Sequence, residues 1–533
     1  MQRIFPFDRA PSGQKASDPP PGSEARHGRE PGSPGSSLSR SSGAKSPRRE
    51  VPFLGGFLSG ALWSLVFLNP SHRVLVWFAL VPLFCSLARH PTRARQRLGH
   101  ALAFGATFCA TTLFWFFPAF LDQQGSGLVG WISAGALCVA SWGSLCLFWA
   151  LFALAAGPLF RARNRAFTCF ALPLLWTGIE ILRASLGWPW VNSWLALGYG
   201  IAAPHPEALV SEWFGVYGLT FALVFTATGA TLLVTEPRLR RQPLWALAAC
   251  AAPAACFGFG LAEEASRPHI RTIPIGAVAH ERGSLPGLMA LTSSLAEGRP
   301  TCVVWPQLQR DDASVGQALE LPVEFGNLLA ATGMTVVTAA GRERGDRNIL
   351  VLGGEGAIAA TRTEPGPTAN YDNTGHLPIY TLGESRFGVA EGFDFLTPQI
   401  ARELRREDAE LLVLSSGSRA AWSVPALEWE ANCLAFRARE NRCWLVSASS
   451  AGVFTFGPKG RRGLRLLSGV DGAGTDDVEA IQGQSPYANW GWWLEPLALG
   501  LAAWLLGWSA WSALAGRTGV PASRLEPSGQ TRR

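Results

Sequence analysis

The stretch TCVVWPQLQ, residues 301–309, decides how the part of the chain around it is interpreted. Its first five residues form a short apolar run that predicts a buried strand, and the run leads into Trp305-Pro306. Gln307 follows at once. A polar amide directly after a buried strand indicates that this strand end faces a site, where many hydrolases and acyltransferases would carry a carboxylate. What surrounds Gln307 therefore decides what the site does.

The surrounding segment, residues 263–489, reads as an α/β domain because strand-like and helix-like runs alternate in it. The predicted strands are 272–279, 301–305, 335–340, 348–354, 386–390, 410–415 and 443–449. The predicted helices are 315–332, 397–408 and 424–440. The segment has no GxGxxG pattern and no P-loop, so its sequence does not indicate nucleotide binding.

The rest of the chain has the composition of a membrane protein. The 533 residues are 48% hydrophobic and only 16% charged, and they include 22 Trp and 30 Phe. A helix needs about 20 apolar residues to cross a bilayer. Eight apolar runs predict eight spans, the second of them short and the fourth longer than a span requires: 51–69, 74–88, 98–121, 127–160, 166–185, 207–234, 242–262 and 490–516.

Arginines in alternate loops predict how these spans are oriented. The loops after the second, fourth and sixth runs are rich in Arg, whereas an intervening loop such as 121–127 has neither Lys nor Arg. The positive-inside rule then places both termini in the cytoplasm and residues 263–489 outside, which in a bacterial inner membrane means the periplasm. Residues 1–50 and 517–533 become cytoplasmic tails, the first predicted to be disordered. The run at 51–69 is expected to be a retained anchor and not a cleaved signal peptide.

The ten cysteines do not form a metal-binding pattern. No CxxC or Cys/His cluster occurs, so neither a zinc site nor another cofactor is expected, and we expect no nucleic-acid partner. Three cysteines lie in the outward segment, at Cys302, Cys433 and Cys443. They are interpreted as buried structural residues, with a relocated nucleophile as the alternative.

Several segments resemble one known family. RFGVAEGFDF (386–395), FRARENRCWLVSASSAG (436–452) and the strand ending in Trp305-Pro306 resemble the nitrilase, or carbon–nitrogen hydrolase, superfamily. In the membrane part, LLWTGIEILRASLGWPWVNSWLALGY (174–199), GVYGLTF (215–221) and YANWGWW (487–493) are similar to segments of the bacterial apolipoprotein N-acyltransferases. The resemblance extends over residues 51–516.

The resemblance implies a multi-span helical membrane domain that carries an α-β-β-α sandwich of the nitrilase type. It also implies a reaction in lipoprotein maturation, with phospholipid and lipoprotein as partners. A Cys thiolate takes an acyl chain from phospholipid and passes it to the N-terminal diacylglyceryl-Cys of an apolipoprotein. A Glu acts as general base and a Lys stabilises the oxyanion, because a thiol must be deprotonated to attack and the intermediate needs a cation or donor.

This chain departs from the family at all three catalytic positions. Gln307 stands where the family has Glu, and an amide cannot accept the thiol proton. Gly392 stands where the family has Cys. The segment NYDNTGHLP (370–378) is the nearest match to the family's Lys segment and places Asn373 or Thr374 there. No Lys occurs between Lys45 and Lys459 in any alignment.

Residues next to these positions have two interpretations each. Gln307 is either a site residue that still hydrogen-bonds a ligand or a solvent-facing strand end. Glu391 and Asp394, which flank Gly392 and Phe393, either form a replacement acid–base pair or are structural. The structural interpretation is favoured, with Asp394 making a hydrogen bond and Glu391 solvated.

Two candidate groups lie in the membrane part. Glu180 and Arg183, three residues apart on one helix face, either pair with each other or contact a phospholipid head group. Trp188 and Trp190 either line a lipid-entry groove or belong to an interfacial aromatic belt.

The favoured function is that of an apolipoprotein N-acyltransferase homologue that lacks the Glu-Lys-Cys triad and binds lipoprotein or phospholipid without turnover. A variant of this hypothesis retains acyl transfer through other residues. The alternative is a non-catalytic membrane scaffold or lipid-handling protein. The eight spans disfavour a soluble nitrilase, and the scarcity of charges deep in the spans disfavours a transporter.

Overall fold

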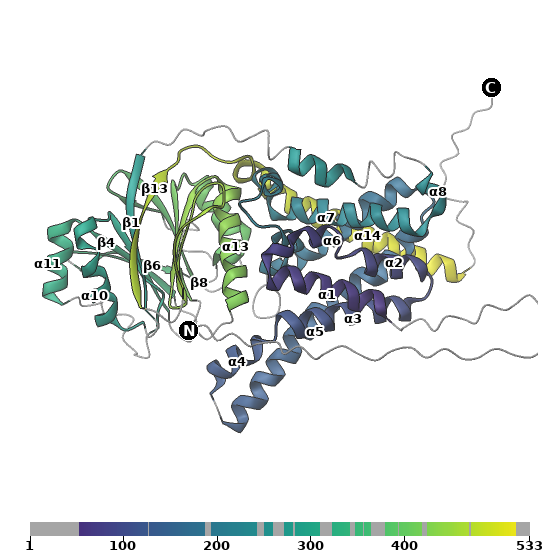
Figure 1. Cartoon of the computed structure of the whole chain (residues 1–533), viewed down its shortest axis with the longest axis horizontal. Helices are drawn as coiled ribbons and strands as arrows, with labels where there is room; N and C mark the ends of the chain where they lie inside the picture. Colours follow the sequence, from purple (N-terminus) through teal and green to yellow (C-terminus); the bar gives the residue numbers. More distant parts are fainter. Residues whose placement is uncertain are drawn as a thin grey trace, which may run out of the picture. The chain divides into compact units, whose positions relative to one another are not determined.

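A computed structural model describes most of the chain beyond its termini. The described residues are 53–125, 127–186, 193–241, 250–258, 271–280, 283–309, 322–341, 347–354, 356–363, 379–392, 394–417, 424–467 and 471–518. The predicted tail 1–50, all but the first two residues of the predicted tail 517–533, and most of the seventh predicted span, 242–262, therefore lie outside the described residues. The two sets of elements in the described part, a helical one and an α/β one, are shown in Figure 1.

The helical set is formed by the two regions of the sequence that contain long apolar runs, 54–240 and 486–518. It consists of α1 (Leu54–Leu68), η1 (Pro70–Trp77), α2 (Val81–Arg89), α3 (Ala94–Thr112), α4 (Phe116–Gln124), α5 (Leu128–Arg161), α6 (Arg165–Ser185), η2 (Ser193–Leu195), η3 (Leu197–Gly200), η4 (Pro206–Val210), α7 (Ser211–Thr235), α8 (Pro237–Arg240) and α14 (Pro486–Thr518). Among the described residues, five helical stretches are long and apolar enough to cross a membrane, and the pair α3–α4, bent by 58°, could add a sixth.

The short second run has a local cause. Asn69 ends α1 in an extended conformation, and its side chain accepts a hydrogen bond from the Ser71 N–H at 2.9 Å. Pro70 then starts the 3-10 helix η1, and α2 follows it; residues 71–89 together form one of the five stretches that could cross a membrane. The fourth run forms the 34-residue helix α5, as its length predicts.

The α/β set contains two sheets. Its strands are β1 (Arg271–Ala279), β2 (Cys302–Val304), β3 (Leu308–Gln309), β4 (Thr335–Gly341), β5 (Arg347–Gly353), β6 (Gly356–Thr363), β7 (Ile379–Leu382), β8 (Ser385–Gly392), β9 (Leu411–Ser416), β10 (Trp444–Ser449), β11 (Gly452–Phe456), β12 (Arg462–Leu467) and β13 (Gly472–Ala480). Its helices are α10 (Leu285–Ser294), η5 (Ala296–Gly298), α11 (Val323–Thr332), η6 (Asp394–Leu396), α12 (Pro398–Arg406) and α13 (Val424–Asn441).

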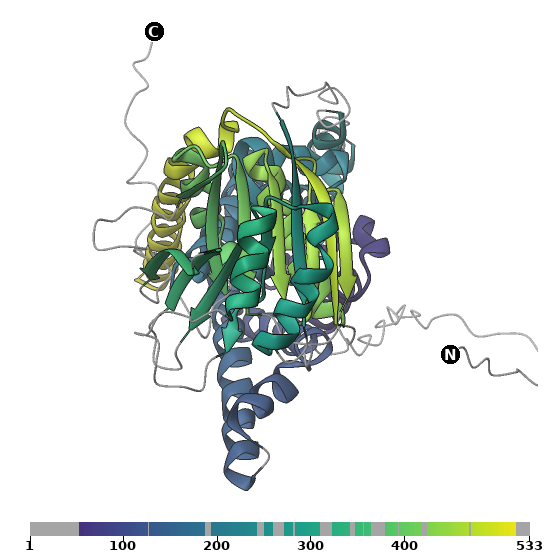
Figure 2. The same ribbon diagram turned by 90° about the vertical axis from the view of Figure 1, so that its left-hand side faces the viewer.

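The sheets pack face to face between two helical layers. One sheet has the order β13-β1-β2-β4-β5-β6, with β3 paired to β4, and the other has the order β12-β11-β10-β9-β8-β7. Helices α10 and α11 cover the outer face of the first sheet, and α13 covers the second sheet on the opposite side (Figures 1 and 2). The predicted fold class, a multi-span helical membrane domain plus an α-β-β-α sandwich, is confirmed.

All seven predicted strands and all three predicted helices are present in the α/β set. Sequence reasoning missed α10 and the strands β3, β6, β7, β11, β12 and β13. Four of these strands, β6, β7, β12 and β13, lie at the edges of the two sheets. An edge strand has a neighbour on one side only and carries more polar residues, as in GAGTDDVEA of β13, so its apolar alternation is weak.

Helix α13 connects the sandwich to the membrane helices through buried polar contacts. Gly215, with φ of 64°, interrupts the helical conformation of α7. The Val216 N–H donates to Glu440 Oε1 of α13 at 2.7 Å, and Glu440 Oε2 lies 2.8 Å from Arg437 Nη1. Asn432 donates to the Tyr199 and Ile201 carbonyls at 2.9 and 3.1 Å. These contacts fix the orientation of α13, which carries one wall of the candidate site.

Candidate functional site

The structure brings Gln307 and Gly392 to one place at the ends of their strands. The Gln307 N–H donates to the Ser416 carbonyl at 3.2 Å, and Ser416 is the register partner of Gly392 in the parallel pair β8–β9. The Gly417 N–H in turn donates to the Gly392 carbonyl at 3.4 Å. Two positions that the resemblance assigns to one catalytic site thus meet at one strand edge, although their chemical roles stay a prediction.

Neither position carries the side chain that the resemblance predicts for it. Gly392 is buried, has φ of 58°, and offers no nucleophile. Glycine adopts this left-handed conformation without the strain that a side chain would introduce. Gln307 is partly exposed at the strand end, with an amide in place of a base. The third position, Asn373 or Thr374, lies outside the described residues, and Lys459 lies in the turn between β11 and β12.

Two acidic residues lie next to Gly392 in the sequence, Asp394 and Glu391, and the structure shows the contacts of the first and the burial of the second. Asp394 Oδ2 accepts the Glu391 N–H at 3.4 Å, and the Asp394 carbonyl accepts hydrogen bonds from the Thr397 N–H and hydroxyl at 3.1 and 2.7 Å. This matches the structural hydrogen bond expected of Asp394. The prediction that Glu391 is solvated is wrong, because Glu391 is fully buried. The strand β8 extends through Gly392 and places Glu391 opposite Ser415 inside the sheet. Phe393 lies outside the described residues.

Sequence reasoning missed three polar residues that build this edge. Ser415 Oγ donates to the Trp305 carbonyl at 3.0 Å and accepts the Ala339 N–H at 2.9 Å, so it joins the two sheets. Ser416 Oγ donates to Glu430 Oε1 of α13 at 3.3 Å. The signal was present: two serines end the apolar run ELLVLSS, and Glu430 stands on the buried side of a helix with 7% exposure.

The three cysteines of the α/β set are buried, as predicted. Burial raises the pKa of Cys302 to about 12 and that of Cys443 to about 11, and it raises the pKa of Cys433 as well. Such thiols hold their protons at neutral pH and are poor nucleophiles. Among the described residues there is no group of three or more His, Cys, Asp or Glu that could hold a metal ion.

In the membrane part, Glu180 is a structural residue. Its Oε1 accepts hydrogen bonds from Trp176 Nε1 at 2.9 Å and from the Leu197 N–H at 3.0 Å, and its Oε2 accepts one from Thr220 Oγ1 at 2.9 Å. These contacts join α6, η3 and α7. Arg183 is 1% exposed, and within the described part of the chain its Nε and Nη2 have no hydrogen-bond acceptor. Trp188 and Trp190 lie outside the described residues.

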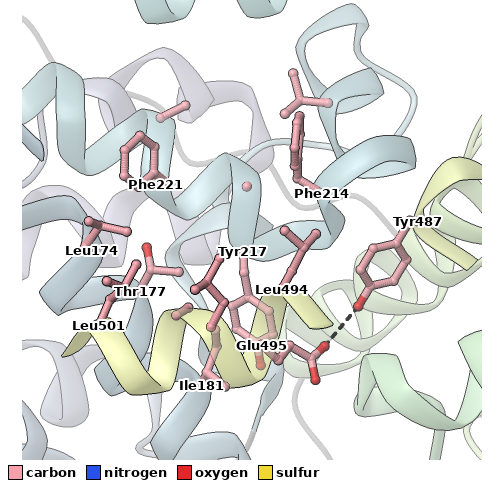
Figure 3. A pocket seen from close by; sticks show the side chains of 15 residues that line it. Leu174, Thr177, Ile181, Phe214, Tyr217, Phe221, Tyr487, Leu494, Glu495 and Leu501 are labelled. Atoms are coloured by element: carbon pink, nitrogen blue, oxygen red, sulfur yellow. Dashed lines mark hydrogen bonds between the residues drawn. The ribbon is translucent and has the colours of Figure 1, made fainter. Parts of the chain in front are cut away.

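A second feature is a cavity of about 430 Å³ between α6, α7 and α14. Its lining is mostly apolar, with side chains such as Leu174, Phe214, Phe221 and Leu501 facing it (Figure 3). Two buried hydroxyls on its wall, Thr177 Oγ1 and Tyr217 Oη, have no hydrogen-bond partner among the described residues. The apolar runs predict each span separately but not which faces of three spans leave a cavity between them.

The polar end of this cavity is formed by Glu495 of α14. Its Oε1 accepts hydrogen bonds from Arg402 Nη1 at 3.0 Å and from Tyr487 Oη at 3.1 Å, the latter drawn in Figure 3. Its Oε2 accepts one from Gln399 Nε2 at 2.7 Å. Arg402 and Gln399 belong to α12 of the sandwich, so the cavity ends where the sandwich contacts the last membrane helix. An apolar cavity with a polar end has the chemistry to hold an acyl chain beside a polar group.

Comparisons with known proteins agree with these features. Residues 59–229 match the model of the apolipoprotein N-acyltransferase N-terminal domain. An apolipoprotein N-acyltransferase from Geobacter metallireducens is 33% identical over 182 residues. That match covers 33% of this chain and 32% of the relative, so the chain matches about a third of the relative's length.

Two solved structures are similar to part of this chain. A variant of the Nesterenkonia AN1 amidase from the nitrilase superfamily is 15% identical, with a TM-score of 0.30, and covers 42% of this chain and 96% of that chain. An amidase from Nesterenkonia sp. is 14% identical, with a TM-score of 0.31, and covers 41% of this chain and 95% of that chain. Residues 59–229 of this chain are therefore similar to the N-terminal domain of apolipoprotein N-acyltransferases.

Proposed function

We propose that this protein is a bacterial inner-membrane homologue of apolipoprotein N-acyltransferase that has lost thioester chemistry and binds phospholipid without transferring its acyl chain. The proposal is carried by Gly392, which occupies the strand end beside Gln307 where the family reaction needs a thiol. Without a nucleophile no acyl-enzyme forms, and the loss of a nucleophile alone costs most of the rate of such a reaction.

The other two changes support this proposal independently. The Gln307 amide has no proton-accepting carboxylate, so a thiol supplied in any other way would not be deprotonated from this position. The chain between Lys45 and Lys459 has no lysine to stabilise an oxyanion. The buried Cys302, Cys433 and Cys443 are not substitutes, because their raised pKa values keep them protonated at neutral pH.

Phospholipid is the proposed ligand because of the cavity between α6, α7 and α14. Its apolar wall suits an acyl chain, and the hydroxyls of Thr177 and Tyr217 provide donors for an ester or phosphate oxygen. Leaving such hydroxyls buried without partners costs about 1–3 kcal/mol each. A lipid whose polar oxygens reach them would recover part of this cost.

The proposed orientation follows the charges of the loops. Arginine-rich loops after α2, α5 and α7 favour the cytoplasmic side, which directs the α-β-β-α sandwich to the periplasm and both termini to the cytoplasm. A lipoprotein acceptor would then meet the sandwich on the outer side of the membrane.

An acyl-transfer assay tests the loss of activity. The purified protein in detergent receives phospholipid as donor and a diacylglyceryl-Cys peptide as acceptor, with a triad-intact homologue as positive control. Mass spectrometry follows both the peptide and the protein. We expect neither acylated peptide nor a protein thioester while the control is active. Acylated peptide would overturn the proposal, and any adduct on the protein would identify the replacement nucleophile.

Lipid binding is tested separately by filling the cavity. Ala222 of α7 lines it and is 8% exposed, whereas Leu147 of α5 is 70% exposed and does not line it. Native mass spectrometry of the detergent-purified protein should show retained phospholipid in the wild type and in Leu147→Trp, and much less in Ala222→Trp. Equal retention in all three would reject the cavity as the binding site. No retained phospholipid in the wild type would favour a scaffold without lipid binding.

A further inference from the structure

Strand pairing places His280 beside Asp471 on the sandwich. His280 follows β1 directly and Asp471 precedes β13 directly, and these antiparallel strands pair Ala279 with Gly472. The next position of the same register therefore sets His280 opposite Asp471. The His280 Nδ1 lies 3.2 Å from Asp471 Oδ1. His280 is 8% exposed, so the imidazole is held inside the fold.

A tight turn then brings a serine to the other nitrogen of the same ring. The Gly283 N–H donates to the His280 carbonyl at 3.1 Å, and Gly283 has φ of 58°, which reverses the chain. Ser284 follows, and its Oγ lies 3.0 Å from His280 Nε2. Gly287 leaves room for the ring, because a Cβ there would lie 1.8 Å from Nε2.

These contacts define where the protons of the imidazole and of the serine hydroxyl lie. The Asp471 carboxylate accepts a hydrogen bond from Nδ1–H, which leaves Nε2 to accept one from the Ser284 hydroxyl. This is the arrangement by which an imidazole removes a proton from a nucleophilic serine. The serine is exposed at the surface, so a substrate in solution reaches it.

The start of α10 supplies donors beside the serine. Ser284 is the N-cap of this ten-residue helix, yet its side chain makes no capping hydrogen bond and contacts the imidazole. Pro286 has no N–H, and among the described residues the Leu285 and Gly287 N–H groups have no acceptor. Free first-turn N–H groups next to a nucleophile can stabilise a developing oxyanion.

We propose that Ser284, His280 and Asp471 form a second catalytic site that hydrolyses small carboxylic esters. Ser284 Oγ bonds to the ester carbonyl carbon while its proton passes to His280 Nε2. The intermediate then breaks its bond to the alcohol, which leaves with that proton. Water then bonds to the carbonyl carbon of the acyl-serine and gives a proton to Nε2. The bond from that carbon to Ser284 Oγ breaks, the acid leaves, and the proton on Nε2 returns to Oγ to restore the hydroxyl. Asp471 is a positioning residue that holds the imidazole.

This site does not depend on the proposed loss of acyl transfer. It uses none of the residues of the strand edge at Gly392 and none of the lining of the cavity between α6, α7 and α14. Ser284 lies at the start of α10, which covers the outer face of the seven-stranded sheet (Figure 1). An inactive acyl-transfer assay and an active esterase assay are therefore compatible, and each can fail alone.

The test uses the full chain in detergent with a fluorophosphonate probe and with p-nitrophenyl acetate. We expect the probe to label Ser284, as identified by peptide mass spectrometry, and Ser284→Ala to lose labelling and at least roughly 100-fold of the ester hydrolysis. Ser293→Ala, an exposed serine of the same helix that donates to the Met289 carbonyl, is the matched control and should keep both.

Asp471→Asn separates positioning from folding. It should lower kcat with little change in KM and alter the pH–rate profile, because the imidazole loses its carboxylate. Thermal unfolding should be close to the wild type in both Ser284→Ala and Asp471→Asn. Absence of probe labelling at Ser284, or equal hydrolysis by Ser284→Ala and the wild type, would overturn the proposal.

Discussion

The ion pair between Arg402 and Glu495 should decide whether the sandwich stays attached to the last membrane helix. Arg402 of α12 and Glu495 of α14 lie 3.0 Å apart, with side chains only 5% and 10% exposed. Burial alone lowers the pKa of Arg402, but the neighbouring Tyr487 and Glu495 outweigh it and the pKa is raised. Arg402 keeps its charge even when Glu495 is removed, because a guanidinium stays protonated inside proteins.

The variant Glu495→Gln removes one charge and preserves the shape of the side chain. Breaking a buried pair by removing one partner costs about 3–5 kcal/mol, because the other charge stays buried without compensation. Replacing both, in Arg402→Met/Glu495→Gln, leaves no buried charge. The amide oxygen can still accept the hydrogen bond from Tyr487, and the amide NH2 group can donate to the side-chain oxygen of Gln399 once that amide turns over, each bond weakened by about 1 kcal/mol. The double variant should be more stable than Glu495→Gln alone.

Thermal unfolding of the full chain in detergent, followed by tryptophan fluorescence, measures these differences. A loss of about 3–5 kcal/mol corresponds to a fall in Tm of roughly 6–20 °C for a domain-sized unit. Glu384→Gln is the control, because Glu384 pairs with Arg271 at a site where its side chain is 87% exposed, and it should leave Tm unchanged. The single variant Arg402→Met is measured in the same assay. The reasoning is refuted if Glu495→Gln stays within about 2 °C of the wild type, or if the loss in the double variant equals the sum of the losses in Glu495→Gln and Arg402→Met.

Three further predictions concern the strand edge and its surroundings. Iodoacetamide at pH 8 should not modify Cys302, Cys433 or Cys443 in the folded protein, because burial raises the pKa values of these thiols, to about 12 for Cys302. All three cysteines should be modified after denaturation. Rapid labelling of the native protein would contradict the burial. Gly392→Ala should lower the free energy of unfolding by about 1–2 kcal/mol, because φ of 58° is unfavourable for any residue with a Cβ, and an unchanged Tm would show that the chain relaxes there. Ser415→Ala should cost about 1–3 kcal/mol by leaving the Ala339 N–H without its acceptor at 2.9 Å, compared in the same unfolding assay with Ser293→Ala, for which no loss is expected.

Much of the fold could be predicted from local patterns. The central strands β2 and β9 are buried along their whole length, so each begins with an apolar run that predicts a strand. The apolar runs of the membrane part likewise form helices, because a long apolar segment satisfies its backbone only as a helix in a bilayer. Edge strands such as β13 escaped prediction, since their polar residues are tolerated only because one side of the strand has no neighbour.

For the candidate site too, some features could be predicted from the sequence and others could not. The sequence by itself determined that positions 307 and 392 carry an amide and a glycine and that no lysine lies between Lys45 and Lys459, because these are statements about residue identity. That these positions correspond to the family's catalytic residues stays a prediction. It did not determine the burial of Glu391, which depends on how far β8 runs beside β9.

Only the tertiary structure decided which distant residues meet. Ser415 contacts β2 and β4, Glu495 contacts α12, and the cavity between α6, α7 and α14 arises from three separate helices. The arrangement of Ser284, His280 and Asp471 needs both the hydrogen bond from the Gly283 N–H to the His280 carbonyl and the pairing of β1 with β13. The first joins residues that are close in sequence, whereas the pairing depends on the packing of the whole sheet, because contacts distant in sequence are set by the shared core and not by any one segment.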